Sequence, residues 1–86
     1  MASIIGTVMS INDEQIDVLV TENINEVNKN ELILVQFDDE LTLKTRVEEL
    51  GLVQGSVVRV LYTEINEING EKVINIIVPE NIMLWQ

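Results

Sequence analysis

Cysteine and histidine are both absent from the sequence. A chain without cysteine has no disulfide framework, no thiolate metal ligand and no thiol nucleophile. A chain without histidine lacks the imidazole that binds zinc, completes a serine–histidine triad and acts as a general base near neutral pH. We therefore expect a non-enzymatic protein with no catalytic residues, no cofactor and no metal site.

Basic residues are few: 5 lysines and arginines stand against 15 aspartates and glutamates, which gives a net charge of −10. Proteins that bind nucleic acid or an anionic membrane use clustered basic side chains, and the sequence has no such cluster. Phe37, Tyr62 and Trp85 are the only aromatic residues, too few for a platform on which bases stack. We expect no direct nucleic-acid binding and no membrane binding.

Long apolar segments are also missing. No apolar run approaches the length that spans a bilayer, and the first residues lack the basic and apolar regions of an export signal. This predicts a cytoplasmic protein, although a mature domain already trimmed of such a signal would have the same sequence. The acidic stretch at residues 38–40 lacks the spaced ligands and the glycine of a calcium loop, and is typical of a solvated turn.

The sequence is rich in residues that form strands. Apolar residues make up 47% of it, and isoleucine and valine are prominent among them. The central stretch is residues 57–62, a run of branched and aromatic residues that follows Gly55. Further along, Asn69-Gly70 predicts a type I′ hairpin turn, which requires a positive φ at both residues. In that register Glu67 faces Lys72, so opposite charges meet across the two strands.

Four further strands are predicted from alternation and turn residues. They cover residues 3–11, 15–22, 31–37 and 71–78. Pro79 is expected to end the last strand because it has no N–H to donate. Gly6 inside the first strand indicates a bulge or a close backbone approach. Residues 23–30 are predicted to form a long hairpin tip, and a bulge is expected at residues 63–66.

Residues 41–50 allow two interpretations. Alternation across residues 41–47 fits a short strand, whereas Leu43, Val47 and Leu50 would share one face of a short helix. We expect an extended start followed by one helical turn at residues 46–50.

The whole pattern predicts a single domain, residues 1–86, with a C-terminal tail at residues 80–86 that packs back on the barrel or on a partner. Two motifs resemble the OB-fold: Gly6-Thr7-Val8 on the first strand, and the later spacing Leu52-x-x-Gly55-x-x-Val58-x-Val60. The layout is similar to S1-type domains such as the barrel of bacterial translation initiation factor one, and to other small bacterial OB-like domains. The resemblance implies an all-β fold, a small five- to six-stranded OB-like barrel with one short helical turn. An SH3-like barrel is the competing architecture.

The sequence departs from this resemblance at Gln54, where such barrels usually carry an apolar residue, and at Ser56, where they often carry aspartate. Nucleic-acid-binding OB-folds place basic and aromatic residues on their second and third strands. The corresponding stretch here offers the acidic residues Asp17, Glu22, Glu26 and Glu31. The resemblance therefore implies the fold, and the nucleic-acid function does not follow from the fold alone.

The leading hypothesis is a non-enzymatic acidic protein-binding module that charge steers towards a basic surface on another protein. Its candidate partner contacts are Asp17, Glu22, Glu26, Arg59 and Trp85. A narrower version is a nucleic-acid mimic that inhibits a DNA- or RNA-handling protein. The alternative from a different class is a structural accessory domain that self-associates into a homo-oligomer.

Overall fold

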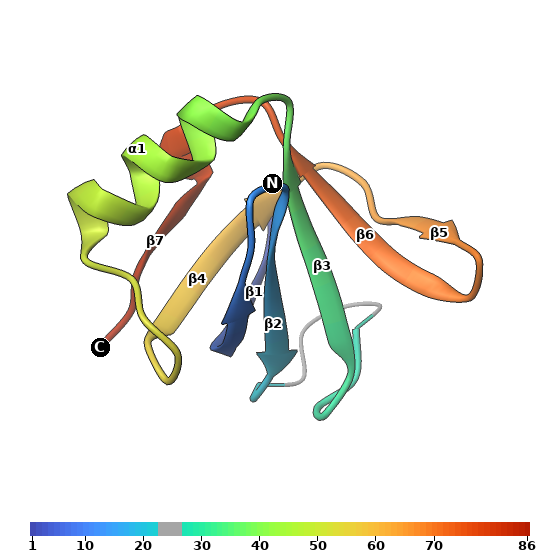
Figure 1. Cartoon of the computed structure of the whole chain (residues 1–86). Coiled ribbons are helices and arrows are strands. Elements are labelled where there is room, and N and C mark those ends of the chain that lie inside the picture. Colours follow the sequence, from blue (N-terminus) through green and yellow to red (C-terminus); the bar gives the residue numbers. More distant parts are fainter. Residues whose placement is uncertain (23–26) are drawn as a thin grey trace.

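The computed structural model describes residues 1–22 and 27–86, which form one sheet and a single α-helix (Figure 1). The strands are β1 (Ala2–Ile11), β2 (Gln15–Val20), β3 (Leu32–Phe37), β4 (Val57–Tyr62), β5 (Asn66–Ile68), β6 (Glu71–Ile76) and β7 (Ile82–Leu84). The helix α1 (Glu40–Leu50) follows β3, and a short 3₁₀ turn, η1 (Pro79–Asn81), precedes β7. The prediction of a small fold built mostly from strands is confirmed.

The sheet is open. Its strand order is β5-β6-β3-β2-β1-β4-β7, so β5 and β7 are the two edges. The pairs are antiparallel except for β3 and β6, which run parallel and side by side (Figure 1). The expected closed barrel of five to six strands is therefore wrong. Residues 63–65 separate β4 from β5, so the two do not form one long strand. The C-terminal segment adds β7 at the edge beyond β4.

The Asn-Gly hairpin forms in the predicted register. Asn69 and Gly70 have φ values of 52° and 79°, as a type I′ turn requires. Ile68 then pairs with Glu71, and Glu67 with Lys72. The interruption at residues 63–65 separates β5 from β4 near the position of the expected bulge. The predicted hairpin tip at residues 23–30 falls partly on residues 23–26, which lie outside the described residues.

The helix is longer than the predicted single turn. The Asp39 carboxylate accepts hydrogen bonds from the Thr42 N–H and the Thr42 hydroxyl, both at 2.8 Å. This cap starts the helix at Glu40, where an extended segment was expected. Gly51, with a φ of 64°, ends it in the left-handed conformation. Leu43 is buried, and Val47 and Leu50 pack against the core, as the alternative helical interpretation requires.

The core lies between the curved sheet and α1, and branched aliphatic residues fill it. Its most completely buried members are Ile4, Val8, Ile16, Val18, Val20, Val27, Ile33, Val35, Val58, Val60, Ile74 and Ile82. Among the described residues no polar or charged side chain is buried. The clean alternation of Ile16, Val18 and Val20 therefore places every charged side chain of β2 away from the core.

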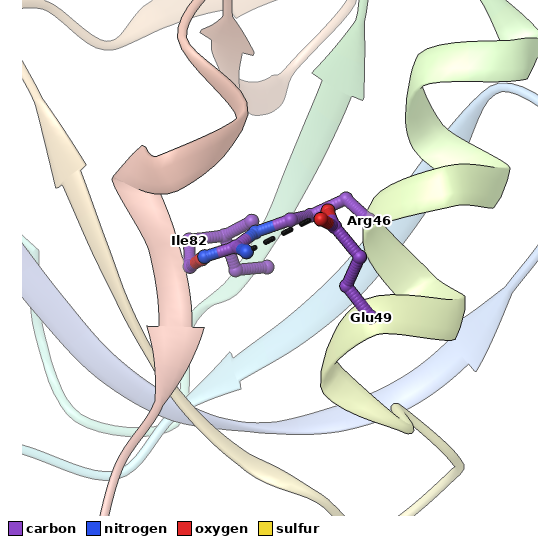
Figure 2. A network of polar contacts seen from close by, with 3 residues as sticks. All are labelled: Arg46, Glu49 and Ile82. Carbon is purple, nitrogen blue, oxygen red and sulfur yellow. Dashed lines mark hydrogen bonds and ion pairs between the residues drawn. The ribbon is translucent and has the colours of Figure 1, made fainter.

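The C-terminal segment is part of the sheet. β6 ends at Ile76, two residues before the predicted end, and Pro79 begins the turn η1 rather than merely stopping a strand. Ile82 is buried in the core, and β7 pairs with β4. The guanidinium of Arg46 donates to the Ile82 carbonyl at 2.8 Å from Nη2 and 3.2 Å from Nε, and so joins α1 to β7 (Figure 2).

Candidate protein-interaction surface

The side of the sheet turned away from the core, which we call the outer face, carries two of the predicted contact residues. Arg59 on β4 pairs with Ile5 on β1, and Thr7 pairs with Leu19 on β2. Because residues two apart on a strand point to the same side, Arg59 and Asp17 share the outer face. They lie on different strands, with β1 between them.

Arg59 and Trp85 are brought together at one edge of the outer face. The Arg59 guanidinium carbon lies 5.2 Å from the centre of the Trp85 ring. The Trp85 N–H donates to the Val57 carbonyl at 2.9 Å, so the backbone fixes the position from which the ring extends. A cation over an indole at an exposed site contributes roughly 0.5–1 kcal/mol. The pair therefore holds a large, partly exposed ring in a defined orientation.

Asp17 is held in a polar network that crosses three strands. Its carboxylate accepts from the Ser10 hydroxyl at 2.9 Å and from the Gln15 amide at 2.7 Å. The Gln15 side-chain oxygen in turn accepts from Gln36 on β3 at 3.3 Å. These bonds occupy acceptor positions on both carboxylate oxygens, so Asp17 already has partners within its own sheet.

The remaining two predicted contacts do not join this arrangement. Glu22 is exposed, just beyond the end of β2. Glu26 lies outside the described residues. Among the four predicted contact residues that the structure describes, Arg59 and Trp85 are the pair in direct contact.

An apolar row crosses the outer face from one edge of the sheet to the other, and sequence reasoning missed it. Its exposed fractions are 38% at Trp85, 40% at Val57, 45% at Leu32 and 50% at Ile68, with half-buried Leu19 between them. Strand pairing places Val57 beside Thr7, Thr7 beside Leu19, and Leu19 beside Leu32. The alternation within each strand was visible in the sequence, but only the strand order shows that these residues align.

Two acidic turns meet at one end of the sheet. Asp13 and Glu14 precede β2, and residues 38–40 follow β3. All five carboxylates line one hollow of about 360 Å³, which we call the acidic hollow. The antiparallel β2–β3 pair causes this meeting, because Gln15 lies opposite Gln36. The predicted strands at residues 15–22 and 31–37, joined by a hairpin tip, already imply that the two flanking turns are neighbours.

Hydrogen bonding lowers the pKa of two carboxyl groups. The Thr42 N–H and hydroxyl hold the pKa of Asp39 below its ordinary value. The pKa of Glu31 is lowered mainly by its hydrogen bond with the Lys72 ammonium, and further by the hydrogen bond from the Asn28 N–H. Asp39 caps the start of α1. Glu31, just before β3, joins that strand to β6 through Lys72, so both carboxylates have structural roles.

The described residues contain no group of three or more histidine, cysteine or acidic side chains arranged to hold a metal ion. Within the same part of the chain, no helix has the length and apolar character needed to cross a bilayer. No protein-family model, no characterised protein and no solved structure matches the sequence or the fold.

Proposed function

We propose that this chain is a non-enzymatic protein-binding module that docks through its outer face on a partner with a basic surface. The observation that carries the proposal is the apolar row beside the Arg59–Trp85 pair. Exposed apolar residues that gather on one face are typical of interaction sites, and tryptophan and arginine are enriched where binding energy concentrates. Four members of the row lie on four different strands, β2, β3, β4 and β5, so a rigid sheet fixes its shape.

Charge supports the choice of partner. Three of the five basic residues are engaged within the chain: Lys72 with Glu31 at 2.9 Å, Arg46 with the Ile82 carbonyl, and Arg59 with Trp85. Most of the 15 acidic residues remain at the surface with a net charge of −10. Such a surface steers basic partners towards the module and repels nucleic acid. The nucleic-acid mimic is the narrower form of this proposal, in which the partner's basic groove normally holds DNA or RNA.

The fold itself we propose to be an OB-like layout opened between β5 and β7. Two connections support it: β1 pairs with both β2 and β4, and α1 joins β3 to β4. The parallel pairing of β3 with β6 adds a third. This layout would offer its outer face to a ligand, and here that face carries the apolar row and one Arg59–Trp85 pair, with no cluster of basic residues among those described.

The test is affinity capture with immobilised protein at low and at high salt. The variant carries Leu32→Thr and Val57→Thr, which remove apolar surface from the row while keeping residues that suit a strand. The matched control is Leu41→Thr, a more exposed apolar residue on α1. We expect a partner that binds the wild type and the control at low salt and is lost with the row variant. Identical capture by all three proteins would contradict the proposal.

Self-association is the competing function, and the edges of the sheet argue against it. β5 is only three residues long, and Arg46 already occupies the Ile82 carbonyl on β7. Each copy also carries a net charge of −10, which opposes pairing of like chains. Sedimentation velocity across the micromolar range is expected to show only monomer, and a concentration-dependent dimer would favour the structural hypothesis.

A further inference from the structure

A second, smaller hollow adjoins the acidic one where α1 packs beside the β1–β2 turn. Its apolar lining comes from Ile11, Leu43 and Val47, and its volume is about 220 Å³. We call it the apolar hollow. Asp13 and Glu40 line both hollows, so the two are neighbours, and we refer to them together as the groove. A dry cavity of about 150 Å³ holds a benzene ring in the well-studied lysozyme case, so this space suffices for one aliphatic or aromatic side chain.

The groove has its apolar side chains in one hollow and most of its carboxylates in the other. The carboxylates of Asp13, Glu14, Asp38 and Glu40 form no hydrogen bond or ion pair with other side chains in the described part of the chain, whereas Asp39 is committed to the helix start. Those four carboxylates remain free to bind a cation from outside. Lys44 lines only the apolar hollow. Its charge repels a cation there, and its methylene stem adds apolar wall.

From this arrangement we infer that the groove binds a short basic–apolar segment of a partner protein. An aliphatic or aromatic side chain enters the apolar hollow, and a neighbouring arginine or lysine contacts the carboxylates of the acidic hollow. Charge complementarity selects this occupant, because an acidic segment would meet the four unpaired carboxylates and a purely apolar one would leave them unmatched. The inference rests on the proposed function and deepens it, since it assigns a second contact region and the sequence character of what binds there.

The site is distinct from the outer face. The apolar row runs across the strands through Leu19 and Val57, whereas the groove lies at the end of β2 and β3 beside α1. A partner could therefore use both regions, and each can be changed without touching the other.

The experiment is an NMR titration of ¹⁵N-labelled protein with a synthetic peptide in which one leucine stands between two arginines. We expect the amide shifts to change at residues 11–14 and 36–44. A peptide with serine in place of leucine is expected to bind more weakly, because the apolar hollow then stays empty. Shift changes spread over the whole acidic surface, or equal binding of both peptides, would overturn the inference.

Charge variants complete the test. Asp13→Asn combined with Glu40→Gln removes the two carboxylates shared by the hollows, and about a tenfold loss of affinity is expected from two partly exposed ion pairs. Glu64→Gln combined with Glu80→Gln removes the same total charge elsewhere and is expected to retain the wild-type affinity to within about twofold. The amide spectrum of each free variant reports whether it is folded. Equal losses in both variants would show binding by net charge alone and would overturn the inference.

The two proposals fail separately. Peptide binding in the groove without any effect of Leu32→Thr and Val57→Thr on capture would remove the outer-face proposal and leave the groove. Capture that depends on the outer face, with no peptide shifts at residues 11–14 and 36–44, would remove the groove and leave the outer face.

Discussion

Gly6 shows how one residue permits a close contact between two strands. A Cβ atom at this position would collide with the Leu19 carbonyl oxygen and would lie 2.6 Å from Cγ1 of Val18. The glycine therefore allows β1 to approach β2 closely. The sequence predicted either a bulge or a close approach here, and the structure shows the approach at Gly6 and an irregularity between Val8 and Ser10.

Replacing this glycine is the first prediction. Gly6→Ala forces β1 and β2 apart, and overpacking of this kind costs about 1–3 kcal/mol. Urea unfolding should show a lower midpoint with little change in slope. Ser3→Ala on the same strand serves as the control and is expected to remain near wild type. A Gly6→Ala protein as stable as the wild type would contradict the close approach.

The Glu31–Lys72 ion pair gives a pH-dependent prediction. Because the folded-state pKa of Glu31 lies below its ordinary value of 4.5, the pair contributes stability above that pH and loses it as the pH falls through the folded value. Lys72→Gln should raise the pKa of Glu31 and flatten the loss of stability in acid. Both side chains are partly exposed, so the effect is small. An NMR titration of the Glu31 carboxyl that is unchanged in Lys72→Gln would contradict this account.

At the scale of elements, Arg46 links α1 to β7. Its two hydrogen bonds reach the Ile82 carbonyl, and its ion pair with Glu49 is longer, at 3.7 Å (Figure 2). A hydrogen bond involving a charged group contributes about 1.5–3 kcal/mol. The bond to β7 therefore matters more than the ion pair on the helix surface.

Arg46→Met should destabilise the protein by about 1–3 kcal/mol and speed amide exchange in residues 82–85. Glu49→Gln keeps the bonds to Ile82 and is the matched control, with little effect expected on either measurement. If Glu49→Gln were as damaging as Arg46→Met, the ion pair would be the important contact and the present account would be wrong.

The helix also shows where sequence reasoning fails. Alternation over residues 41–47 fits a strand, but the Asp39 cap and Gly51 at the other end are local helix signals that outweigh it. The hairpin at Asn69-Gly70 was predictable to the exact register because its turn chemistry is specific. The edge position of β7 was not predictable, because the sequence of its three residues does not indicate that they pair with β4.

The candidate site likewise has features that local sequence patterns predict and features that they do not. That Asp17 and Arg59 point away from the core follows from alternation, and the meeting of the acidic turns follows from the β2–β3 hairpin. The Arg59–Trp85 contact and the apolar row depend on the order of strands in the sheet, which local patterns do not encode. Sequence reasoning therefore found single residues and missed their alignment.

For the whole molecule, the excess of negative charge should oppose folding at low ionic strength. Carboxylates at the surface repel one another more strongly in the compact state than in the unfolded chain, and salt screens this repulsion. The midpoint of thermal unfolding should rise as sodium chloride is added. Glu64→Gln combined with Glu80→Gln should reduce the slope of that rise. A midpoint that falls with salt would mean that favourable ion pairs dominate instead.

The central claim is that the apolar row on the outer face and the net negative charge of the chain direct this sheet towards proteins and away from nucleic acid. The most direct measurement is fluorescence anisotropy with labelled single-stranded DNA and RNA over a salt series that begins at low ionic strength. We predict no binding even at the lowest salt, because clustered cations are missing and most of the surface charge is negative. Tight binding that weakens as salt is added would contradict the claim and would indicate that the chain binds nucleic acid directly.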